Sequence, residues 1–558
     1  MDLRGTVEVV YVDSADGASL RLALSTDEGR YGLHVTGPAP ALVTGTPLRV
    51  RGRRLPGLVI GDHGGNAGAI LAAAEDLEPE HLGLGGSVDG SGNALGTLAD
   101  TLGEQRTLVI LVNFQDAPAD QPWSLAGASS VVYGEVSGYL EEASFGATWL
   151  QGEVHGWYTL AQDSTLCDSN ALRTLALAAA VDDGVALEAF DRVIFAFPGS
   201  PCGYSGMATL GGKPSYAWLA GHLDLRVTGH ELGHNLGLRH AHFLDCGAEV
   251  LGASCTSIEY GDPTDLMGGL ENTGHFQAAS KEQLGWLAAP GAPTIGTATA
   301  SGVFPLEPYA ASPAGGDKGL RIHQGSDPLT GGDVWYYLEY RQPVGADSGL
   351  AATPGLHEGV LLRRVAPENG GLGAWLLDGS PASASTTYGD LVDAALVVGA
   401  SFTDAAAGIT LTLLSADASG AQVEVNLTGA TSEPPVDPPA EEPPPLPAPE
   451  PAPVNMAPVA VDDGATIPKG GSAVIDLLAN DHDPDGDPIS VVAVGAPAHG
   501  EVQLDPGGTL TYIPSRKFTG EEVFVYTIGD GDLEASAMVR IAVVASGGGG
   551  KGGGKGGR

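Results

Sequence analysis

The sequence predicts a multidomain chain of the mixed α+β class, in which one α/β unit lies between units made only of strands. Alternating apolar stretches with glycine-containing turns occupy residues 1–60 and recur through residues 291–430. Between them, strand-like and helix-like apolar patterns alternate over residues 101–290. A Pro-rich acidic segment, residues 431–456, then precedes a further series of short strands at residues 457–546.

Residues 1–60 predict a small OB-like β-barrel, which is either part of a propeptide or a fixed accessory domain. The turn signals Asp16-Gly17 and Glu28-Gly29 separate apolar or alternating runs at residues 7–12, 19–24 and 48–52. Residues 61–100 are rich in Gly, Ala and Asp and predict a linker or an activation segment.

Residues 101–290 predict the α/β unit. The nearly continuous apolar run at residues 107–114 is typical of a strand that is buried on both faces. We expect a helix near 129–143, a strand around 154–158, a helix near 170–189 and a core strand at 192–197. This series leads to the most informative stretch, residues 230–240, which read His-Glu-Leu-Gly-His-Asn-Leu-Gly-Leu-Arg-His.

The stretch 230–240 has the spacing of a catalytic zinc site. His230 and His234 are four residues apart and therefore face the same side of a helix. Gly237 is suited to the left-handed conformation that ends a helix, and the resulting turn would return His240 to the same ion. Three protein ligands leave a fourth position open for water. Glu231 is the candidate base that accepts a proton from that water.

An ordinary amphipathic helix with hydrogen-bonded histidines is the alternative to a zinc site. Five of the 14 histidines fall between His222 and His242, so the clustering does not follow from a His-rich composition. His222 would share a helical face with His230 only near the start of the helix. His242 is a second candidate for the third ligand, but the Gly-x-x-His spacing favours His240. We expect His155 to be structural.

The motif resembles the extended zinc-binding motif of metzincin endopeptidases, in which a Met-containing turn lies below the metal. Residues 259–268, Glu-Tyr-Gly-Asp-Pro-Thr-Asp-Leu-Met-Gly, provide Met267 as the corresponding residue. With the later segment 281–286, Lys-Glu-Gln-Leu-Gly-Trp, the pattern is most similar to the gametolysin-type (M11-like) metallopeptidases over residues 105–290. The resemblance implies a zincin/metzincin-like catalytic domain at 101–290. Gly269 stands where astacin-like and serralysin-like enzymes have their transition-state tyrosine, so that residue is not carried over.

The resemblance also implies an edge strand that pairs with extended substrate just before the active-site helix. Tyr216, Ala217 and Trp218 lie at that place and belong either to that edge or to an interior strand. Asp262 and Asp265 are candidates for fixing the Met-turn or for contacting a ligand histidine.

The positions of the cysteines constrain how the zinc site could be blocked before activation and whether the protein is exported. Because no cysteine precedes Cys167, a thiolate of the N-terminal region cannot block the zinc, and an aspartate such as Asp89 or Asp100 is the remaining candidate. The four cysteines allow three pairings. The pairs Cys246–Cys255 and Cys167–Cys202 would fit export, and four buried free thiols are the alternative.

The net charge of −42, from 68 acidic and 26 basic residues, disfavours nucleic acid and anionic membranes as partners. No apolar run approaches the roughly 18 residues of a membrane span. We predict a secreted, extracellular protein, but the first residues contain no signal core. A signal segment would have been removed, or the sequence would be a fragment that lacks it. The alternative is a cytosolic enzyme.

The remaining regions predict all-β units. Alternating runs at 335–340, 359–365 and 409–414 predict a β-sandwich at 291–430. Residues 431–456 predict an extended spacer, and residues 457–546 predict an Ig-like sandwich that resembles cadherin-like and bacterial Ig-like repeats. One turn of this sandwich contains four aspartates that form either a calcium site or a solvated turn: Asp481, Asp483, Asp485 and Asp487. Residues 547–558 are a Gly/Lys tail.

The sequence thus predicts a secreted zinc endopeptidase that cleaves extracellular, cell-wall or matrix proteins, with Zn2+ and, through the aspartate turn, Ca2+ as candidate cofactors. The C-terminal domain would bind a cell-surface or matrix ligand. The alternatives are an adhesin-like surface protein with a degenerate zincin domain and a zinc hydrolase of a non-peptide substrate. Glu231 argues against the adhesin, because a dead enzyme has no physical need for that acid.

Overall fold

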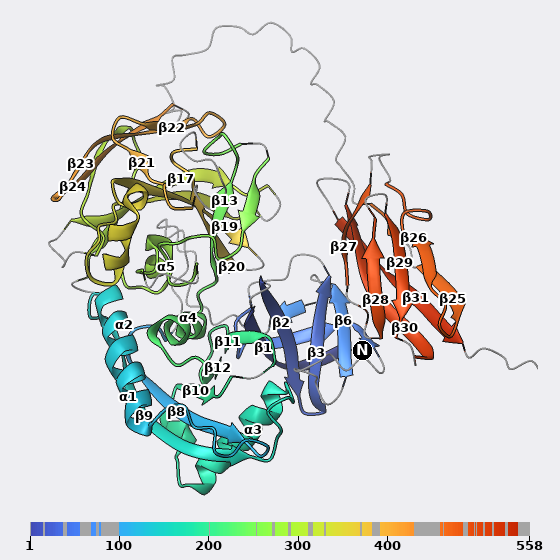
Figure 1. Cartoon of the computed structure of the whole chain (residues 1–558). Helices are drawn as coiled ribbons and strands as arrows, with labels where there is room; N and C mark the ends of the chain where they lie inside the picture. Colours follow the sequence, from blue (N-terminus) through green and yellow to red (C-terminus); the bar gives the residue numbers. More distant parts are fainter. Residues whose placement is uncertain are drawn as a thin grey trace, which may run out of the picture. The chain divides into compact units, whose positions relative to one another are not determined.

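The computed structural model forms two compact units, residues 1–434 and 435–558. It describes residues 2–14, 17–36, 42–55, 68–73, 77–79, 100–199, 201–252, 254–269, 274–287, 292–310, 316–328, 331–368, 371–381, 391–428, 458–460, 463–483, 489–495, 497, 499–505, 508–515, 518–529 and 534–544. Strands dominate both units, and the helices gather in the first (Figure 1).

The α/β unit contains five strands at one end of a twelve-stranded sheet, in the order β11-β12-β10-β8-β9. They are β8 (Gly103–Phe114), β9 (Thr148–Leu160), β10 (Arg192–Phe197), β11 (Tyr204–Thr209) and β12 (Ser215–Ala220). β8, β9, β10 and β12 run parallel, and β11 runs antiparallel to β12. The run of apolar residues in β8 is explained by burial on both faces, because Val109 and Leu108 pack into different cores.

Helices cover both faces of these five strands (Figure 1). One face packs against a continuous helical segment and the motif helix, and the other packs against α3. These elements are α1 (Leu125–Ser129), η2 (Ser130–Val136), α2 (Ser137–Ala143), α3 (Ser169–Asp182), η3 (Leu187–Ala189) and α4 (Leu225–Asn235). The helices and strands predicted for residues 107–197 are confirmed, with shifts of several residues at their ends.

The N-terminal strands continue the same sheet. They are β1 (Asp2–Ser14), β2 (Gly17–Thr26), β3 (Gly29–Thr36), β4 (Pro47–Arg51), β5 (Arg53–Leu55), β6 (Gly68–Ala73) and β7 (Leu77–Pro79). β6 and β7 fall within residues 61–100, which we predicted to be a linker, and they pair with β3, β5 and β4. β1 pairs with β11, so the N-terminal strands adjoin the edge of the α/β unit.

Two further sheets follow the motif and share a buried core. The larger contains β13 (Ala241–Asp245), β14 (Thr256–Ile258), β15 (Thr294–Thr297), β17 (Asp317–Ser326), β18 (Asp333–Glu339), β19 (Gly359–Glu368), β20 (Gly371–Leu377) and β21 (Leu396–Val397). The smaller contains β16 (Gly302–Leu306), β22 (Ser401–Asp404), β23 (Ile409–Asp417) and β24 (Gly420–Leu427). The connections include α5 (Ala278–Gln283), η4 (Gly345–Ala352) and η5 (Pro354–Leu356). Because β13 pairs with β20, the larger sheet crosses the boundary predicted at residue 290.

The second unit is a two-sheet structure around one apolar core. Its strands are β25 (Asp463–Pro468), β26 (Ala473–Asp476), β27 (Ser490–Val494), β28 (Gly500–Leu504), β29 (Thr509–Pro514), β30 (Gly520–Gly529) and β31 (Glu534–Val544). The spacer at 431–456 and the tail at 547–558 lie outside the described residues.

Candidate metal centre

The histidine motif lies on α4 and on the turn that follows it. Asp224 caps the helix, because its Oδ1 accepts a hydrogen bond from the Val227 backbone N–H at 2.9 Å. Gly237 has a φ of 103°, the left-handed conformation predicted for it. Its N–H donates to the carbonyl of His234 at 2.8 Å. The chain turns sharply here and brings His240 to the other two motif histidines.

The Nε2 atoms of His230, His234 and His240 converge on one small volume. Those of His234 and His240 are 3.0 Å apart, and the three ring centroids are separated by 4.8 to 5.3 Å. All three residues are buried, with exposed fractions of 9%, 0% and 3% of the whole residue. The grouping predicted from the spacing is therefore present in the structure.

Each of these rings has its other nitrogen held by an oxygen acceptor. Nδ1 of His230 and Nδ1 of His234 each lie 2.8 Å from a backbone carbonyl, and Nδ1 of His240 lies 3.0 Å from Oε1 of Glu259. A carbonyl only accepts, so the proton is assigned to Nδ1 and the Nε2 lone pair faces the cluster.

This arrangement fits a metal ion. Two buried lone pairs at 3.0 Å repel each other unless a positive charge lies between them, and Nε2 of His230 has no hydrogen-bond partner. Burial lowers the pKa of His234 to about 4, so this ring is neutral at neutral pH. Although burial lowers it, Asp13 and Glu259 together raise the pKa of His240. Imidazoles whose Nδ1–H is held by a carbonyl or carboxylate are typical metal ligands.

Asp13, from β1, is the fourth member of the cluster. Its Oδ1 is 3.1 Å from Nε2 of His240, and its Oδ2 is 3.4 Å and 3.5 Å from Nε2 of His234 and His230. Ligand atoms of the four residues all lie within 4.8 Å of one another. Nothing in the sequence around Asp13 predicted this position.

Glu231 is buried beside the cluster, with 1% of its surface exposed. It lies against Gly206 of β11, where an added Cβ would come within 1.9 Å of Glu231 Oε1. Gly206 is also the register partner of Asp13. Oε2 of Glu231 has no hydrogen-bond partner. Burial, followed by the charge of Asp13, raises the pKa of Glu231 well above its usual value, which suits a group that takes up a proton.

Met267, the candidate Met-turn residue, packs against α4. It is fully buried, and a Cβ added to Gly233 would come within 2.3 Å of its Sδ. Oδ1 of Asp265 accepts from the Met267 backbone N–H at 2.8 Å, and Oδ2 of Asp262 accepts from Nε of Arg363 at 2.7 Å. Both aspartates therefore fix the turn, the first of the two roles expected for them.

Two residues just before the Met-turn belong to the site and were not predicted. Glu259 accepts from His240, as described above, and the Tyr260 hydroxyl donates to Oδ1 of Asp13 at 2.7 Å. The Tyr260 ring lies 4.2 Å from the His240 ring, centroid to centroid. Burial raises the pKa of Tyr260, so its hydroxyl stays protonated. In the sequence, only the position of Glu259 and Tyr260, between the third histidine and the Met-turn, could have indicated that they belong to the site.

The other histidines lie outside the cluster. His242 is on β13 and its Nε2 is 3.3 Å from Oε2 of Glu368. His222 precedes the start of α4, and half of its side chain is exposed. His155 pairs with Glu153 at 2.8 Å, in agreement with its expected structural role.

Tyr216, Ala217 and Trp218 lie on β12, which has partners on both sides, β10 and β11. These residues therefore lie on an interior strand and not on an edge strand, which were the two alternatives from the sequence. Ala217 and Trp218 are 1% and 2% exposed. Within the α/β unit, the two outer strands are β11 and β9, and β11 is the one that lies against Glu231.

The aspartates proposed for calcium lie in the second unit. Asp481 accepts a hydrogen bond from the Tyr526 hydroxyl at 2.9 Å, and Asp483 lies two residues further along. Asp485 and Asp487 fall outside the described residues. Calcium binding stays a prediction.

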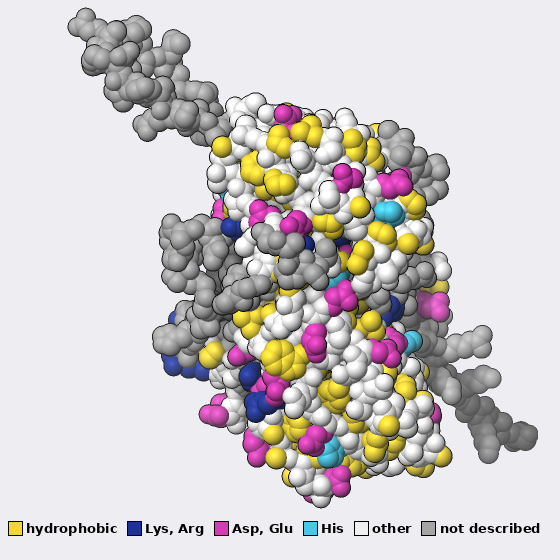
Figure 2. Space-filling view, turned by 90° about the vertical axis from the view of Figure 1, so that its left-hand side faces the viewer, with side chains coloured by type: hydrophobic (Ala, Val, Ile, Leu, Met, Phe, Trp, Pro, Cys, Tyr) yellow, Lys and Arg dark blue, Asp and Glu magenta, His cyan; other side chains and the backbone are white. Residues whose placement is uncertain are grey.

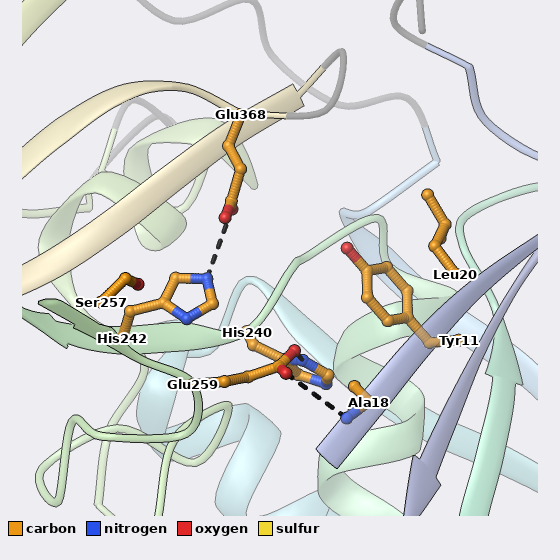
Figure 3. Close-up of a pocket in the computed structure, with 8 residues that line it drawn as sticks. All are labelled: Tyr11, Ala18, Leu20, His240, His242, Ser257, Glu259 and Glu368. Atoms are coloured by element: carbon orange, nitrogen blue, oxygen red, sulfur yellow. Dashed lines mark hydrogen bonds and ion pairs between the residues drawn. The ribbon is translucent and has the colours of Figure 1, made fainter. Parts of the chain in front are cut away.

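A pocket of about 400 Å3 opens beside His240 (Figure 3). One wall is formed by Tyr11, Ala18 and Leu20, from β1 and β2. The rest is lined by His240, His242, Ser257, Glu259 and Glu368. The N-terminal strands thus adjoin the segment that carries the third histidine.

Disulfides join both predicted cysteine pairs, Cys167–Cys202 and Cys246–Cys255. Two disulfides are typical of extracellular proteins. Over the described ranges, no helix has the length and apolar character needed to cross a membrane. Figure 2 shows acidic side chains scattered over the face drawn, with Lys and Arg in a few small groups.

Residues 134–355 match the family model of the gametolysin peptidase M11, and residues 455–542 match that of a bacterial Ig domain. The comparison with curated proteins finds no match. Two solved structures that are similar to this chain are the endo-fucoidan hydrolases MfFcnA4 and MfFcnA9 of glycoside hydrolase family 107, at 13% and 11% identity and TM-scores of 0.14 and 0.13. The alignments cover 34% and 48% of this chain but 23% and 38% of those chains, and at these scores they carry no argument. The family matches support a metallopeptidase and confirm the resemblance predicted from the motifs: a region similar to the gametolysin (M11) peptidases is followed by a bacterial Ig domain.

Proposed function

We propose that the chain is a zinc-dependent endopeptidase of the metzincin type, with His230, His234 and His240 as metal ligands and Glu231 as the proton acceptor. One observation carries the proposal: three buried Nε2 lone pairs converge while each Nδ1–H is held by an oxygen, beside a carboxylate whose Oε2 lacks a partner. The M11 match over residues 134–355 supports peptide bonds as the target.

The fold around the cluster supports a zincin-like assignment. Four parallel strands and the antiparallel β11 carry α3 on one face and α4 on the other. Met267 closes the space below α4, where Gly233 leaves room for its sulfur. This packing keeps the helix that carries His230 and His234 at a fixed height above the Met-turn.

Each group of the site has a separate role in peptide-bond hydrolysis. A zinc ion, when bound, polarises the scissile carbonyl and lowers the pKa of water to about 7. Glu231 accepts a proton from the attacking water and returns it to the leaving amine. The Tyr260 hydroxyl, which donates to Oδ1 of Asp13 at 2.7 Å, is positioned to donate to an oxyanion at that place.

Extended polypeptide is the substrate class that the edge strand favours. β11 is the strand of the α/β unit that adjoins Glu231, through Gly206. Main-chain pairing along such an edge binds peptides without requiring particular side chains. The two disulfides support secretion, and the family resemblance suggests matrix or cell-wall proteins as substrates. We assign the binding of a surface or matrix ligand to the C-terminal Ig domain.

The test compares Glu231→Ala and Tyr260→Phe with Glu249→Ala, which changes an exposed acid in the nearby disulfide loop. Glu231→Ala should retain zinc, measured by atomic absorption after dialysis, and lose hydrolysis of an unstructured labelled protein. Tyr260→Phe should retain zinc and lose about 10²–10³ in kcat, the usual cost of one oxyanion donor. Glu249→Ala should match the wild type. Hydrolysis by Glu231→Ala at the wild-type rate would refute the assignment.

A further inference from the structure

β1 lies along the edge of β11 as an added antiparallel strand. Val10 is opposite Thr209, and Asp13 is opposite Gly206, the residue against which Glu231 lies. The pairing continues past the end of β11, since the Leu210 N–H donates to the carbonyl of Val9 in β1 at 2.8 Å. The chain's own N-terminus therefore occupies the edge to which an extended peptide would pair.

Asp13 meets the metal cluster at the position of a fourth ligand. A tetrahedral ion with bonds of about 2.0–2.1 Å keeps its ligand atoms about 3.3 Å apart. The carboxylate oxygens of Asp13 lie 3.1, 3.4 and 3.5 Å from the three Nε2 atoms. Oδ2 is buried without a hydrogen-bond partner, while Oδ1 accepts from the Tyr260 hydroxyl. A buried carboxylate oxygen without a hydrogen-bond partner, among three imidazole nitrogens, is a group that a bound metal ion would stabilise.

We propose that Asp13 is the fourth protein ligand of the metal and that β1 is a built-in inhibitor, which holds both the open metal position and the substrate edge of β11. The inference rests on the proposed function, because it assigns the regulation of that same site. It replaces the expectation that Asp89 or Asp100 blocks the metal: Asp100 lies 3.9 Å from Nζ of Lys213, and Asp89 is outside the described residues.

Further contacts hold β1 in this position. The Tyr11 ring stacks on the His234 ring, with centroids 4.4 Å apart and planes 3° from parallel. The Tyr11 hydroxyl accepts from Nη1 of Arg239 at 2.9 Å. Glu8 pairs with Arg173 of α3 at 2.7 Å, and both side chains are largely buried. These contacts fix the register that places Asp13 at the metal, so activity requires β1 to leave β11.

The same contacts predict how the full-length chain treats a small metal-directed ligand. While Asp13 is bound, a ligand reaches the metal only in the fraction of molecules from which the carboxylate has withdrawn. The apparent dissociation constant is then the intrinsic constant divided by that fraction. Removing the Asp13 carboxylate should lower the apparent dissociation constant to its intrinsic value and leave the three histidines in place.

The experiment uses full-length protein loaded with Co2+, whose visible absorption reports the ligand set, and acetohydroxamate as the probe. We compare the wild type with Asp13→Ala, the nearly isosteric Asp13→Asn and the control Asp27→Ala, an exposed aspartate in the turn between β2 and β3. Both Asp13 variants should change the cobalt spectrum and bind acetohydroxamate about tenfold or more tightly than the wild type. Asp27→Ala should match the wild type.

Cobalt spectra and hydroxamate affinities of both Asp13 variants equal to those of the wild type would overturn the inference. Hydrolysis of the unstructured protein separates this outcome from failure of the proposed function. If the inference and the proposed function both hold, the Asp13 variants also hydrolyse it about tenfold or more faster than the wild type. Changed spectra and tighter hydroxamate binding without hydrolysis would support Asp13 as a ligand while refuting the peptidase.

Discussion

Replacing Glu259 with Gln tests how strongly a carboxylate outside the ligand set controls metal affinity. Glu259 accepts the Nδ1–H of His240 at 3.0 Å; the His240 side chain is 1% exposed and that of Glu259 is 40% exposed. Loss of such a partner typically costs 10–100-fold in metal affinity. Because solvent screens the exposed part of Glu259, we expect the low end of that range, about tenfold or ~1.4 kcal/mol.

Zinc affinity is measured by competition with a chromophoric chelator for wild type, Glu259→Gln and the control Glu249→Gln. The Gln amide oxygen still accepts from His240, so the ring keeps its orientation and stability should change by less than about 0.5 kcal/mol. Glu249 is exposed and lies in the preceding disulfide loop, so its replacement should leave affinity unchanged. Wild-type affinity in Glu259→Gln, or an equal loss in Glu249→Gln, would show that the negative charge of Glu259 beside His240 does not set affinity.

Two predictions concern the packing around the Met-turn. Gly233→Ala would place a Cβ within 2.3 Å of the Met267 sulfur and should destabilise the fold by about 1–3 kcal/mol in denaturant unfolding; Gly138→Ala, on α2 with nothing within 4 Å, should not destabilise it. Burial, followed by the charge of Asp262, raises the pKa of Asp265 from 3.8 to about 7. Between these values the folded state holds a proton that the unfolded state releases, so stability should fall as pH rises through this window and level off above it. Asp265→Asn should remove that pH dependence, measured as the difference in unfolding free energy from wild type at pH 5 and 8, and an unchanged slope would contradict the assignment.

The sequence predicted the elements whose determinants are local. Helix α4, the turn at Gly237 and the grouping of three histidines follow from spacing within eleven residues, because helical geometry links positions four apart. β8 and β10 were found because strands buried on both faces need continuous apolar runs. By contrast, β6 and β7 were missed because they are short, and β6 has little alternation in its Gly- and Ala-rich sequence.

The missed parts of the site depend on pairing between distant segments. Asp13 reaches the cluster because β1 pairs with β11, almost two hundred residues later in the chain, and no local pattern encodes that pairing. For the same reason, the sequence could not decide whether residues 215–220 formed an edge or an interior strand. That depends on β11, whose sequence Tyr-Ser-Gly-Met-Ala-Thr gives only a weak strand signal.

The strand that follows the third histidine ties the metal centre to residues far beyond it. β13 begins at Ala241 and pairs in parallel with β20, and Arg363 of β19 donates to Asp262 in the Met-turn. A fragment ending near residue 290 would leave β13 without this neighbour and Asp262 as a buried charge without its guanidinium. Removing one partner of such a buried pair typically costs about 3–5 kcal/mol. We therefore expect the smallest fragment that keeps His240 in place to extend at least through Leu377, because the sandwich packs as one folded unit with the segment that carries the third histidine.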